Sequence, residues 1–371
     1  MGKIDLHIVS FDVPFPADYG GVIDVYYKLK ALHGIGVKIH LHCFEYGRKR
    51  ALELNQFCQK ISYYKRDTSF TNVFSKVPYI VKSRMNYELL NNLLIDQHPI
   101  LFEGLHCCGF LANDELKNRF KIVRTHNVEH FYYLGLAQAE LGLIKQQYFN
   151  LESQKLERFE SVLSNASVIM PLSISDKLYF EKYQTKVQYL PPFVEQFELV
   201  NNEQTIDFCI YHGNLSVAEN IKAVFFLLEV FSSLKYKLII AGKNPNAKMK
   251  QRISHFKNVE LIENPGDIEL NHLIQSAKLN CLPTFQATGI KLKLIKSLML
   301  GNDVLVNHEM LEGNNLEQYC IVAKTKNQWQ QKIKEVFASK PNSIELKKRR
   351  LAVSIEFDNL RNAKLLKELL A

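Results

Sequence analysis

Short runs of apolar residues alternate with amphipathic segments along the whole chain. The apolar runs are typical of strands buried on both faces, and the amphipathic segments are typical of covering helices. This alternation predicts parallel sheets of the α/β class. In the first half the expected strands are Ile4–Ser10, Val37–Phe44, Ile61–Lys65, Ile100–Glu103, Lys121–Thr125, Val168–Leu172 and Val187–Leu190. In the second half they are Ile206–His212, Lys237–Ala241, Val259–Glu263, Lys278–Pro283, Val304–Asn307 and Tyr319–Ala323.

The spacing of these strands indicates two domains. A chain of 371 residues exceeds one ordinary hydrophobic core. Between the two sets of strands, LPPFVEQFELVNNEQTID combines two prolines with a polar, acidic run, which is typical of a linker. We therefore expect domains at 1–191 and 206–342, followed by a helical segment at 343–371. One extended helix is expected from 137 to 164, in which Gly142 is the single internal breaker.

The stretch from Leu282 to Asn307, LPTFQATGIKLKLIKSLMLGNDVLVN, predicts a strand, a glycine turn, a helix and a second strand. Thr288 fits the N-cap of that helix, and Gly289 permits close approach of a ligand to the backbone. The first amides of the helix would then offer partial positive charge to an anion.

Lysines on this helix support the same interpretation. At 100° per residue, Ile290 belongs to a broad apolar arc, whereas Lys293, Lys296 and Ser297 occupy the remaining sector. Lys291 falls inside the arc, where an ammonium is costly unless it meets an anion or the helix begins only after it. Either arrangement points Lys291 toward the mouth of a site for a phosphate or diphosphate.

Four segments in chain order carry a resemblance to a known family. They are LHIVSFDVPFPADYGGVIDVYYKLKALHGIGVKIHLHCF near the start, RTHNVEH at 124–130, YHGNLSVAENIKAV at 211–224 and GIKLKLIKSLMLG at 289–301. Together they resemble the sequence of family 4 glycosyltransferases, which are retaining enzymes. The resemblance implies the GT-B fold, an α/β fold with two Rossmann-like domains facing across a cleft. It also implies that the chain from Asp358 onward crosses back to pack on the first domain.

The resemblance further implies transfer of a hexosyl unit, such as mannosyl, from a nucleotide diphosphate sugar without a metal or other cofactor. The acceptor would be a glycan or lipid-linked, and the pathway surface polysaccharide synthesis. His126 would contact the transferred sugar, and Gly20 and Gly21 would close over the diphosphate. The donor-binding residues would be Gly213, Asn214, Thr288, Gly289, Ile290, Lys291, Lys293 and Lys296.

The chain departs from the family pattern at four positions. The family usually carries a pair of glutamates where this chain has Thr288 and Lys296, and a basic pair where it has Asn214 and Asn220. These changes motivate an alternative function, a GT-B-like subunit that binds a nucleotide sugar without turnover and serves a partner enzyme.

Two further loops follow strands of the first half. Asp18, Gly20 and Gly21 precede a helix expected at Val22–His33, and paired glycines there fit a phosphate or sugar cradle or a simple tight turn. His126 ends a strand, where ligand-facing residues of open sheets collect, although it could also cap the following helix through local backbone. Asn127 is the better N-cap, which favours a ligand-facing His126.

On the acceptor side, Glu103 and His106 lie at the end of the strand ILFE. Glu103 could act as a general base, or both residues could hold their loop in place. The segment 68–84, TSFTNVFSKVPYIVKSR, mixes aromatic and basic residues and fits either an element at an anionic membrane surface or a partly buried loop.

Net charge, cysteine count and hydropathy limit which classes of protein the chain can belong to. A net charge of +9 predicts anionic partners, but no helix-turn-helix, zinc-finger, RNP or KH pattern supports nucleic acid binding. Seven cysteines without a framework spacing indicate reduced thiols, and the adjacent Cys107 and Cys108 fit a metal site poorly. No secretory signal or membrane-spanning run is visible. We therefore expect a cytoplasmic protein, and the first of the two interpretations of segment 68–84 would place it at the inner face of the membrane.

Overall fold

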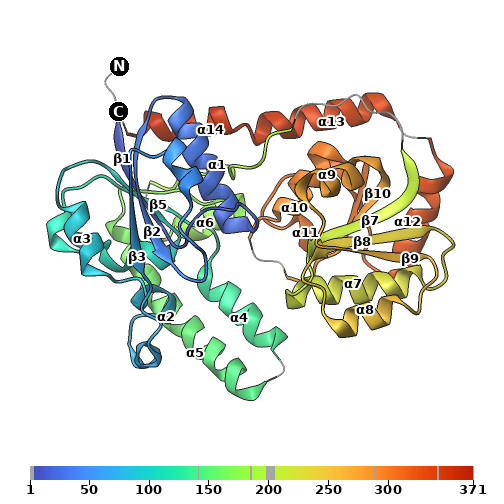
Figure 1. Cartoon of the computed structure of the whole chain (residues 1–371), viewed down its shortest axis with the longest axis horizontal. Helices are drawn as coiled ribbons and strands as arrows, with labels where there is room; N and C mark the ends of the chain where they lie inside the picture. The colour runs from blue at the N-terminus through green and yellow to red at the C-terminus, as the bar shows by residue number, and fades with distance from the viewer. Residues whose placement is uncertain are drawn as a thin grey trace. The chain divides into compact units, whose positions relative to one another are not determined.

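The computed structural model describes residues 4–140, 142–183, 186–197, 205–286, 289–340 and 342–370. The chain forms two compact units (Figure 1). The first comprises Met1–Glu195 together with Phe357–Ala371, and the second comprises Gln196–Glu356. In the described part of the chain, each unit is built on one six-stranded sheet whose strands are all parallel, which confirms the predicted α/β class.

The sheet of the first unit has the order β3-β2-β1-β4-β5-β6. Its strands are β1 (Asp5–Ser10), β2 (Lys38–Glu45), β3 (Lys60–Lys65), β4 (Ile100–Glu103), β5 (Lys121–Arg124) and β6 (Val168–Ile169). Its helices are α1 (Gly20–Gly34), α2 (Tyr79–Lys82), α3 (Tyr87–Leu93), α4 (Glu129–Ala139), α5 (Leu143–Phe159), α6 (Ile174–Phe180) and α14 (Asn359–Glu368). Short 3₁₀ turns are η1 (Leu52–Gln56), η2 (Phe70–Phe74), η3 (Leu105–Phe110), η4 (Asp114–Leu116) and η5 (Glu160–Asn165).

The last helix of the chain belongs to the core of the first unit. Helix α14 packs on α1, and its Ala363 and Leu366 are buried in the same hydrophobic cluster as the sheet. Asp358 caps α14 by accepting from the Arg361 amide. Lys367 donates from Nζ to the carbonyl of Ile35 at 2.7 Å, just beyond the end of α1. These contacts fix the C-terminal segment against the first sheet.

The sheet of the second unit has the order β12-β11-β10-β7-β8-β9. Its strands are β7 (Ile206–Asn214), β8 (Lys237–Lys243), β9 (Val259–Glu263), β10 (Ala277–Leu282), β11 (Asp303–Val306) and β12 (Ile321–Val322). Its helices are α7 (Ala218–Phe231), α8 (Ala247–Ile253), α9 (Asp267–Ser276), α10 (Leu292–Leu300), α11 (His308–Leu311), α12 (Lys326–Ala338) and α13 (Ser343–Glu356), with the turn η6 (Glu317–Tyr319). In Figure 1, α7 and α8 lie on one side of this sheet and α9 and α10 on the other.

Close backbone packing and capping fix the second sheet. Gly213 and Gly242 are register partners on β7 and β8, and a Cβ on Gly242 would lie 2.0 Å from the carbonyl oxygen of Gly213. Helix α12 starts at a capping box formed by Thr325 and Gln328. The fully buried Trp329 donates from Nε1 to the carbonyl of Ala323 at 3.0 Å, which satisfies its polar atom inside the core.

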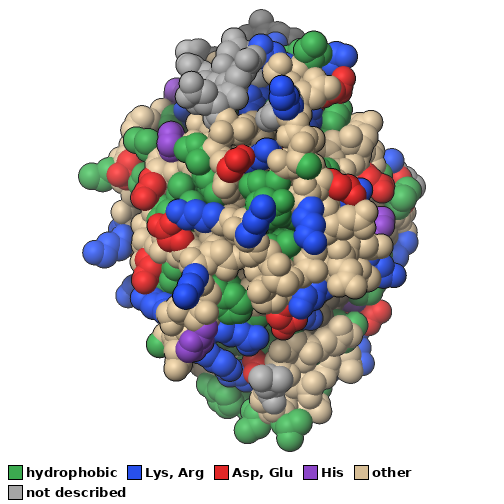
Figure 2. Space-filling view, turned by 90° about the vertical axis from the view of Figure 1, so that its right-hand side faces the viewer, with side chains coloured by type: hydrophobic (Ala, Val, Ile, Leu, Met, Phe, Trp, Pro, Cys, Tyr) green, Lys and Arg blue, Asp and Glu red, His purple; other side chains and the backbone are tan. Residues whose placement is uncertain are grey.

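Charged side chains are distributed rather than gathered on the face that Figure 2 shows, where Lys and Arg lie among Asp and Glu. Ion pairs of the second unit include Lys237 with Glu260 at 2.7 Å and Lys332 with Glu335 at 2.8 Å. Among the described residues, no helix is both long enough and apolar enough to cross a bilayer.

Most expected strands form within two residues of the predicted bounds, but three predictions were wrong. At 187–190 there is only an isolated bridge between Ile169 and Val187. The helix expected from 137 to 164 is two helices, since α4 ends at Ala139 and α5 starts with Gly142 as its N-cap. These two helices pack on each other, which a single straight helix could not do. The helical segment from 343 likewise breaks before Asp358, giving α13 and α14.

Candidate functional site

Each sheet reverses its strand order at one point. In the first unit the chain moves outward through β1, β2 and β3, and then resumes at β4 beside β1. In the second unit the same reversal lies between β7 and β10. In open parallel sheets, ligands bind outside the carboxyl ends of the strands at such switch points. We call the two places the first and second switch points.

The second switch point brings together the sequence-predicted residues at the end of β7 and at the start of α10. Gly213 and Asn214 are the last two residues of β7. A Cβ on Gly213 would lie 3.3 Å from the Asn220 side chain, so this glycine allows close packing of β7 and α7. Asn220 in turn donates from Nδ2 to the carbonyl of Asn214 at 2.8 Å.

The start of α10 differs from the prediction. The helix begins at Leu292, and Lys291 is the N-cap residue with extended backbone. Gly289 has a φ of 68°, so the glycine provides a left-handed turn before the helix. Ile290 therefore lies in the loop and not on the helix, while Thr288, the predicted N-cap, lies outside the described residues. Of the two arrangements weighed for Lys291, a helix that begins after it is the observed one.

Lys293 is the most constrained lysine at this place. Its Nζ donates to Asn220 Oδ1 at 2.8 Å and contacts the hydroxyl of Tyr211 at 3.3 Å. The same ammonium lies 5.1 Å from the centroid of the Tyr211 ring. Burial lowers the pKa of Lys293 to about 8, although the carboxylate of Glu219 acts in the opposite direction.

Lys291 and Glu219 complete the polar group. Burial also lowers the pKa of Lys291, with Glu219 and Glu312 offsetting part of the effect. Glu219 lies in the first turn of α7 and is hydrogen-bonded to the hydroxyl of Thr284, which follows β10. Burial removes water from both ammonium groups, and the nearby carboxylates compensate for only part of that loss. An anionic ligand would compensate for the rest.

Lys296 and Ser297 occupy different environments, although both were expected on the polar sector. Lys296 lies 5.6 Å from the ring centroid of Phe197. Ser297 is fully buried, and its hydroxyl is 2.9 Å from Nε2 of His212. Burial, together with the charges of Lys296 and Lys293, lowers the pKa of His212 to about 3, so its imidazole is neutral. The sector opposite the apolar arc is therefore not uniform, since Ser297 faces β7 through its contact with His212.

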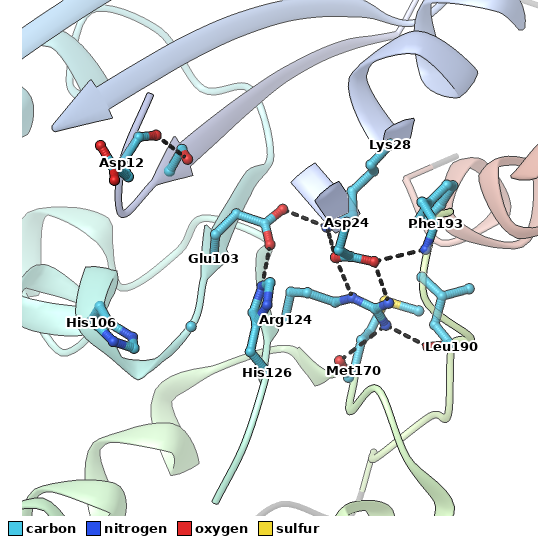
Figure 3. Close-up of polar contacts among 12 residues, drawn as sticks. Asp12, Asp24, Lys28, Glu103, His106, Arg124, His126, Met170, Leu190 and Phe193 are labelled. Atoms are coloured by element: carbon cyan, nitrogen blue, oxygen red, sulfur yellow. Dashed lines mark hydrogen bonds and ion pairs between the residues drawn. The ribbon is translucent and has the colours of Figure 1, made fainter. Parts of the chain in front are cut away.

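The first switch point contains a buried network of charged side chains (Figure 3). Lys28 of α1 donates from Nζ to Asp24 at 2.8 Å and to Glu103 at 2.6 Å. The other oxygen of Glu103 is 3.0 Å from Nε2 of His126. Arg124 Nη2 pairs with Asp24 Oδ1 at 3.0 Å.

Glu103 and His126, both predicted site residues, are thus direct partners at the ends of β4 and β5. Burial would raise the pKa of Glu103, but Lys28 and His126 hold it below its ordinary value, so the carboxylate stays ionised. His126 is 8% exposed, and its ring edge meets Phe11 with centroids 5.4 Å apart. Within the described part of the chain, Nδ1 of His126 has no hydrogen-bond partner. That nitrogen is buried as well as unpaired, so it is a polar atom whose hydrogen-bonding capacity is unused in this structure.

Asp24, Glu103 and His126 also place three ligand-type atoms within 4.8 Å of one another. A metal ion does not fit among them, because the ammonium of Lys28 already bridges the two carboxylates. The network has the charge balance of an internal ion-pair cluster, with hydrogen bonds to each buried charge.

His106 lies one step farther from the network. The turn before it has Gly104 at a φ of 73°, and a Cβ there would lie 2.8 Å from Nδ1 of His106. The same nitrogen is 3.8 Å from Oε1 of Glu129, in the first turn of α4. Burial lowers the pKa of His106 well below its ordinary value and raises that of Glu129 to about 8. The pair is therefore largely uncharged at neutral pH.

The glycine loop after β1 differs in detail from the expectation. Helix α1 begins at Gly20 rather than at Val22. Gly21 packs closely on Phe11, whose Cζ would lie 2.6 Å from an added Cβ, whereas Gly20 has open space beside it. Asp18 is paired with Arg48 at 2.8 Å. Gly20 is thus the open position of the loop, and Asp18 is held by an arginine.

Sequence reasoning missed Asp24, Lys28, Arg124 and His212. A signal for the first two was present, because Asp24 and Lys28 are four residues apart on a helix whose Val25 and Leu29 are buried. Polar residues at that spacing beside an apolar face indicate an internal ion pair. Arg124 and His212 each follow directly on apolar residues of a strand, Ile122 and Val123 in β5 and Ile210 and Tyr211 in β7, which is the same kind of signal.

The raised pKa of Glu129 predicts a pH dependence of stability. Between pH 4.5, where the unfolded carboxyl ionises, and about 8, the folded state holds a proton that the unfolded state has lost. Stability therefore decreases as pH rises through this window, by up to about 1.4 kcal/mol per pH unit from this group. Glu129→Gln should remove that part of the slope and make the protein more stable than wild type at pH 8. Urea unfolding at pH 5, 6.5 and 8 measures the difference.

The exposed Glu157 on α5 provides the matched control, since Glu157→Gln should leave the wild-type slope unchanged. An identical pH slope in wild type and Glu129→Gln would show that Glu129 is ionised in the folded protein.

Comparison with known proteins supports the fold. Residues 207–339, which contain the second switch point, match the family model "Glycosyl transferases group 1". A protein of Klebsiella pneumoniae, described as an uncharacterized 44.6 kDa protein in cps region, is 26% identical over 318 residues. The match covers 78% of this chain and 79% of the relative.

Solved structures extend the likeness to the whole chain. Alr3699/HepE of Anabaena, in complex with UDP and glucose, is 10% identical with a TM-score of 0.68, and the match covers 99% of each chain. WaaG, a glycosyltransferase involved in lipopolysaccharide biosynthesis, is 12% identical with a TM-score of 0.65 over 99% of each chain. Both are GT-B structures. The predicted GT-B fold is thereby confirmed: the chain consists of two Rossmann-like units of parallel sheet, one of which matches the group 1 glycosyl transferases.

Proposed function

We propose that the protein is a glycosyltransferase that moves a hexosyl unit, such as mannosyl, from a nucleotide diphosphate sugar to a glycan or lipid-linked acceptor in surface polysaccharide synthesis. Three findings support sugar transfer: the family model matched at residues 207–339, the relative in a cps region, and the UDP-bound structural neighbour. Retention of configuration and independence from metal are further parts of the proposal, and they rest on the family resemblance.

The observation that carries the proposal is the pair of partly desolvated lysines at the second switch point. Lys291 and Lys293 both have pKa values lowered by burial, and both lie where α10 begins. A diphosphate bound there would interact with two ammonium groups, and its negative charge would raise the pKa values of both lysines. The same charges would stabilise the nucleoside diphosphate as it leaves the sugar.

At the first switch point, His126 is the proposed catalytic residue. Glu103 binds its Nε2 and leaves Nδ1 for a sugar hydroxyl or leaving oxygen. Glu103 is then a positioning residue, and its burial against Lys28 argues against the alternative role of general base. Gly20, at the open position of its loop, is the proposed point of approach for the donor.

A panel of UDP, GDP and ADP sugars tests the proposal by following release of nucleoside diphosphate with glycan and lipid-linked acceptors. Release with at least one donor is the expected result. The alternative of a non-catalytic binding subunit is favoured by Lys296, which replaces a carboxylate of the family pattern with a group that can only donate hydrogen bonds. A melting shift without release for every donor would support that alternative and overturn the transferase.

Nucleoside diphosphates should raise the melting temperature, because a ligand that binds only the folded state stabilises it by mass action. Lys291→Ala should weaken binding about tenfold or more, the usual loss for a hydrogen bond to a charged group, and should remove most of the shift. Its melting temperature without ligand should stay near the wild-type value. Lys248→Ala on the exposed face of α8 is the matched control and should keep the shift. A full shift in Lys291→Ala would place the diphosphate elsewhere.

His126→Ala should reduce sugar transfer or donor hydrolysis by a factor of about 10² or more, the usual contribution of an acid–base group. Affinity for the nucleoside diphosphate should change little, since the proposed contact is to the sugar. Steady-state kinetics and calorimetric titration separate the two effects. His33→Ala, at an exposed histidine of the same unit, should leave both unchanged. Unaltered turnover in His126→Ala would remove this residue from the site.

Contact with an anionic membrane is part of the proposal and rests on the first unit. Phe70 and Phe74 are 73% and 78% exposed and form an edge-to-face pair with centroids 5.6 Å apart. Lys155 donates to the carbonyl of Val73 at 2.6 Å, so this turn lies beside α5, where Ile144 is also exposed. Arg84, expected among the basic flanks, is instead buried and donates to the carbonyls of Phe11 and Ile80.

Phe70→Ser/Phe74→Ser should lower the fraction of protein that sediments with vesicles containing an anionic phospholipid by at least half, because the two rings supply the apolar contact. Leu52→Ser, at an exposed apolar residue elsewhere on the same unit, is the matched control and should sediment like wild type. Equal sedimentation of the double variant and wild type would contradict this surface as the membrane contact.

A further inference from the structure

Four of the twelve histidines of the chain gather at one place on the first sheet. Asp5 begins β1 and His40 lies near the start of β2, whereas the first switch point lies at the opposite ends of these parallel strands. His7 is the register partner of His40, and His98 lies in the loop before β4. The cluster is thus separate from the site proposed above and does not depend on the proposed function.

Asp5, His40 and His98 have the geometry of a metal-binding set. One ligand-type atom of each lies within 4.8 Å of the others. His40 Nε2 is 2.9 Å from Asp5 Oδ1, and the rings of His40 and His98 stack with centroids 5.8 Å apart. Tetrahedral zinc with bonds of 2.0–2.1 Å holds its ligand atoms about 3.3 Å apart. Small side-chain rotations would therefore close the set around an ion.

The loop that carries His98 is held in place. Arg119 donates from Nε to the carbonyl of His98 at 2.9 Å and from Nη1 to the carbonyl of Asp96 at 2.8 Å. Asp96 accepts from the backbone amide of His98 at 2.9 Å and from His7 Nε2 at 3.0 Å. This second layer of contacts orients the histidine before any ion binds, as outer partners do in metal sites.

The cluster also has room and an accessible side. A cavity of about 140 Å³ adjoins the cluster on the side of His40 and is lined also by His7, Lys60 and Asp96, whereas Asp5 and His98 lie outside its lining. The side chain of His98 is 41% exposed, which provides an entry path for an ion.

The cluster of Asp5, His40 and His98 differs from the one around Lys28 in the distance between its carboxylate and the neighbouring ammonium group. There an ammonium contacts two carboxylates at 2.8 Å or less, and no space for an ion remains. Here the ammonium of Lys38 is 3.9 Å from Oδ2 of Asp5, and Oδ1 is 2.9 Å from Nε2 of His40. Lys60 in the cavity wall raises the cost of a cation, and the carboxylate of Asp96 offsets that cost.

We propose that Asp5, His40 and His98 bind one divalent transition-metal ion, with Zn²⁺ as the ion that two imidazoles and a carboxylate fit best and water as the fourth ligand. The ion would join the starts of β1 and β2 to the loop before β4. Its position at the amino ends of the strands gives it a structural role rather than a role at the switch point.

The test uses the full chain without an affinity tag, treated with chelator and then dialysed. Wild type should bind one equivalent of Zn²⁺ by atomic absorption, show a visible Co²⁺ spectrum of tetrahedral type, and gain melting temperature with Zn²⁺ but not with Mg²⁺. His40→Ala/His98→Ala should lose the equivalent, the spectrum and the gain. His272→Ala, at an exposed histidine of α9, should keep all three.

His98→Ala alone serves as the second variant, because its exposed side chain leaves folding least affected. It should weaken Zn²⁺ binding at least tenfold while keeping the circular dichroism of wild type. Absence of binding in wild type would overturn the proposal. Equal binding in His98→Ala and wild type would also overturn it.

Discussion

The buried carboxylate of Asp24 organises the first unit. Burial would raise its pKa, but Arg124 and Lys28 hold the pKa well below its ordinary value, so the carboxylate is ionised inside the protein. It accepts from the guanidinium of Arg124, the ammonium of Lys28 and the backbone amide of Phe193 at 2.8 Å. Through these contacts Asp24 holds β5 and the segment that follows the first sheet. Lys28 extends the network to Glu103 at the end of β4. Removing one member of such a set leaves an uncompensated charge and typically costs about 3–5 kcal/mol.

This network connects elements that are far apart in the sequence. Arg124 donates to the carbonyls of Leu190 and Pro191, and Asn359 makes hydrogen bonds with both the amide and the carbonyl of Val194. The segment that leaves the first sheet is therefore held by β5 on one side and by the start of α14 on the other. The path of the chain out of the first unit, and its return after residue 356, are determined by these polar contacts within the hydrophobic core.

The two switch points differ in how far their buried charges are compensated by partners of opposite sign. At the first, each charge faces a partner of opposite sign, and Lys28 contacts two carboxylates. At the second, the contacts of Lys293 are the neutral oxygens of Asn220 and Tyr211, and burial lowers its pKa to about 8. Incomplete compensation is costly in the isolated protein and favourable for an anionic ligand. This difference supports an organising role for the first cluster and, within the proposed function, an anion-binding role for the second.

The sequence predicted the strands well because a parallel strand buried on both faces is a continuous apolar run, as in β8, where residues 238–242 are all buried. It failed where a single residue decides between two acceptable local structures. Helix α4 ends at Ala139 and Gly142 is the N-cap of α5, and α10 begins only at Leu292, after Gly289 and Lys291. Partners of Glu103 and His126 were missed for another reason: Lys28 is 75 residues from Glu103 in the chain, and only the fold brings them together.

Within the proposed function, Lys296 would change what the second switch point can recognise. A carboxylate at this position could accept hydrogen bonds from ribose hydroxyls, whereas an ammonium can only donate. The ammonium of Lys296 lies over the ring of Phe197. Its positive charge also helps to lower the pKa of His212, so that this imidazole stays neutral. Lys291, Lys293 and Lys296 therefore add positive charge around the start of α10, and in the proposed function no carboxylate at position 296 would accept hydrogen bonds from the nucleoside. Nucleotide binding at this place should depend more on the diphosphate than on the ribose. Salt should weaken this binding, because dissolved ions screen the attraction between the lysines and the diphosphate.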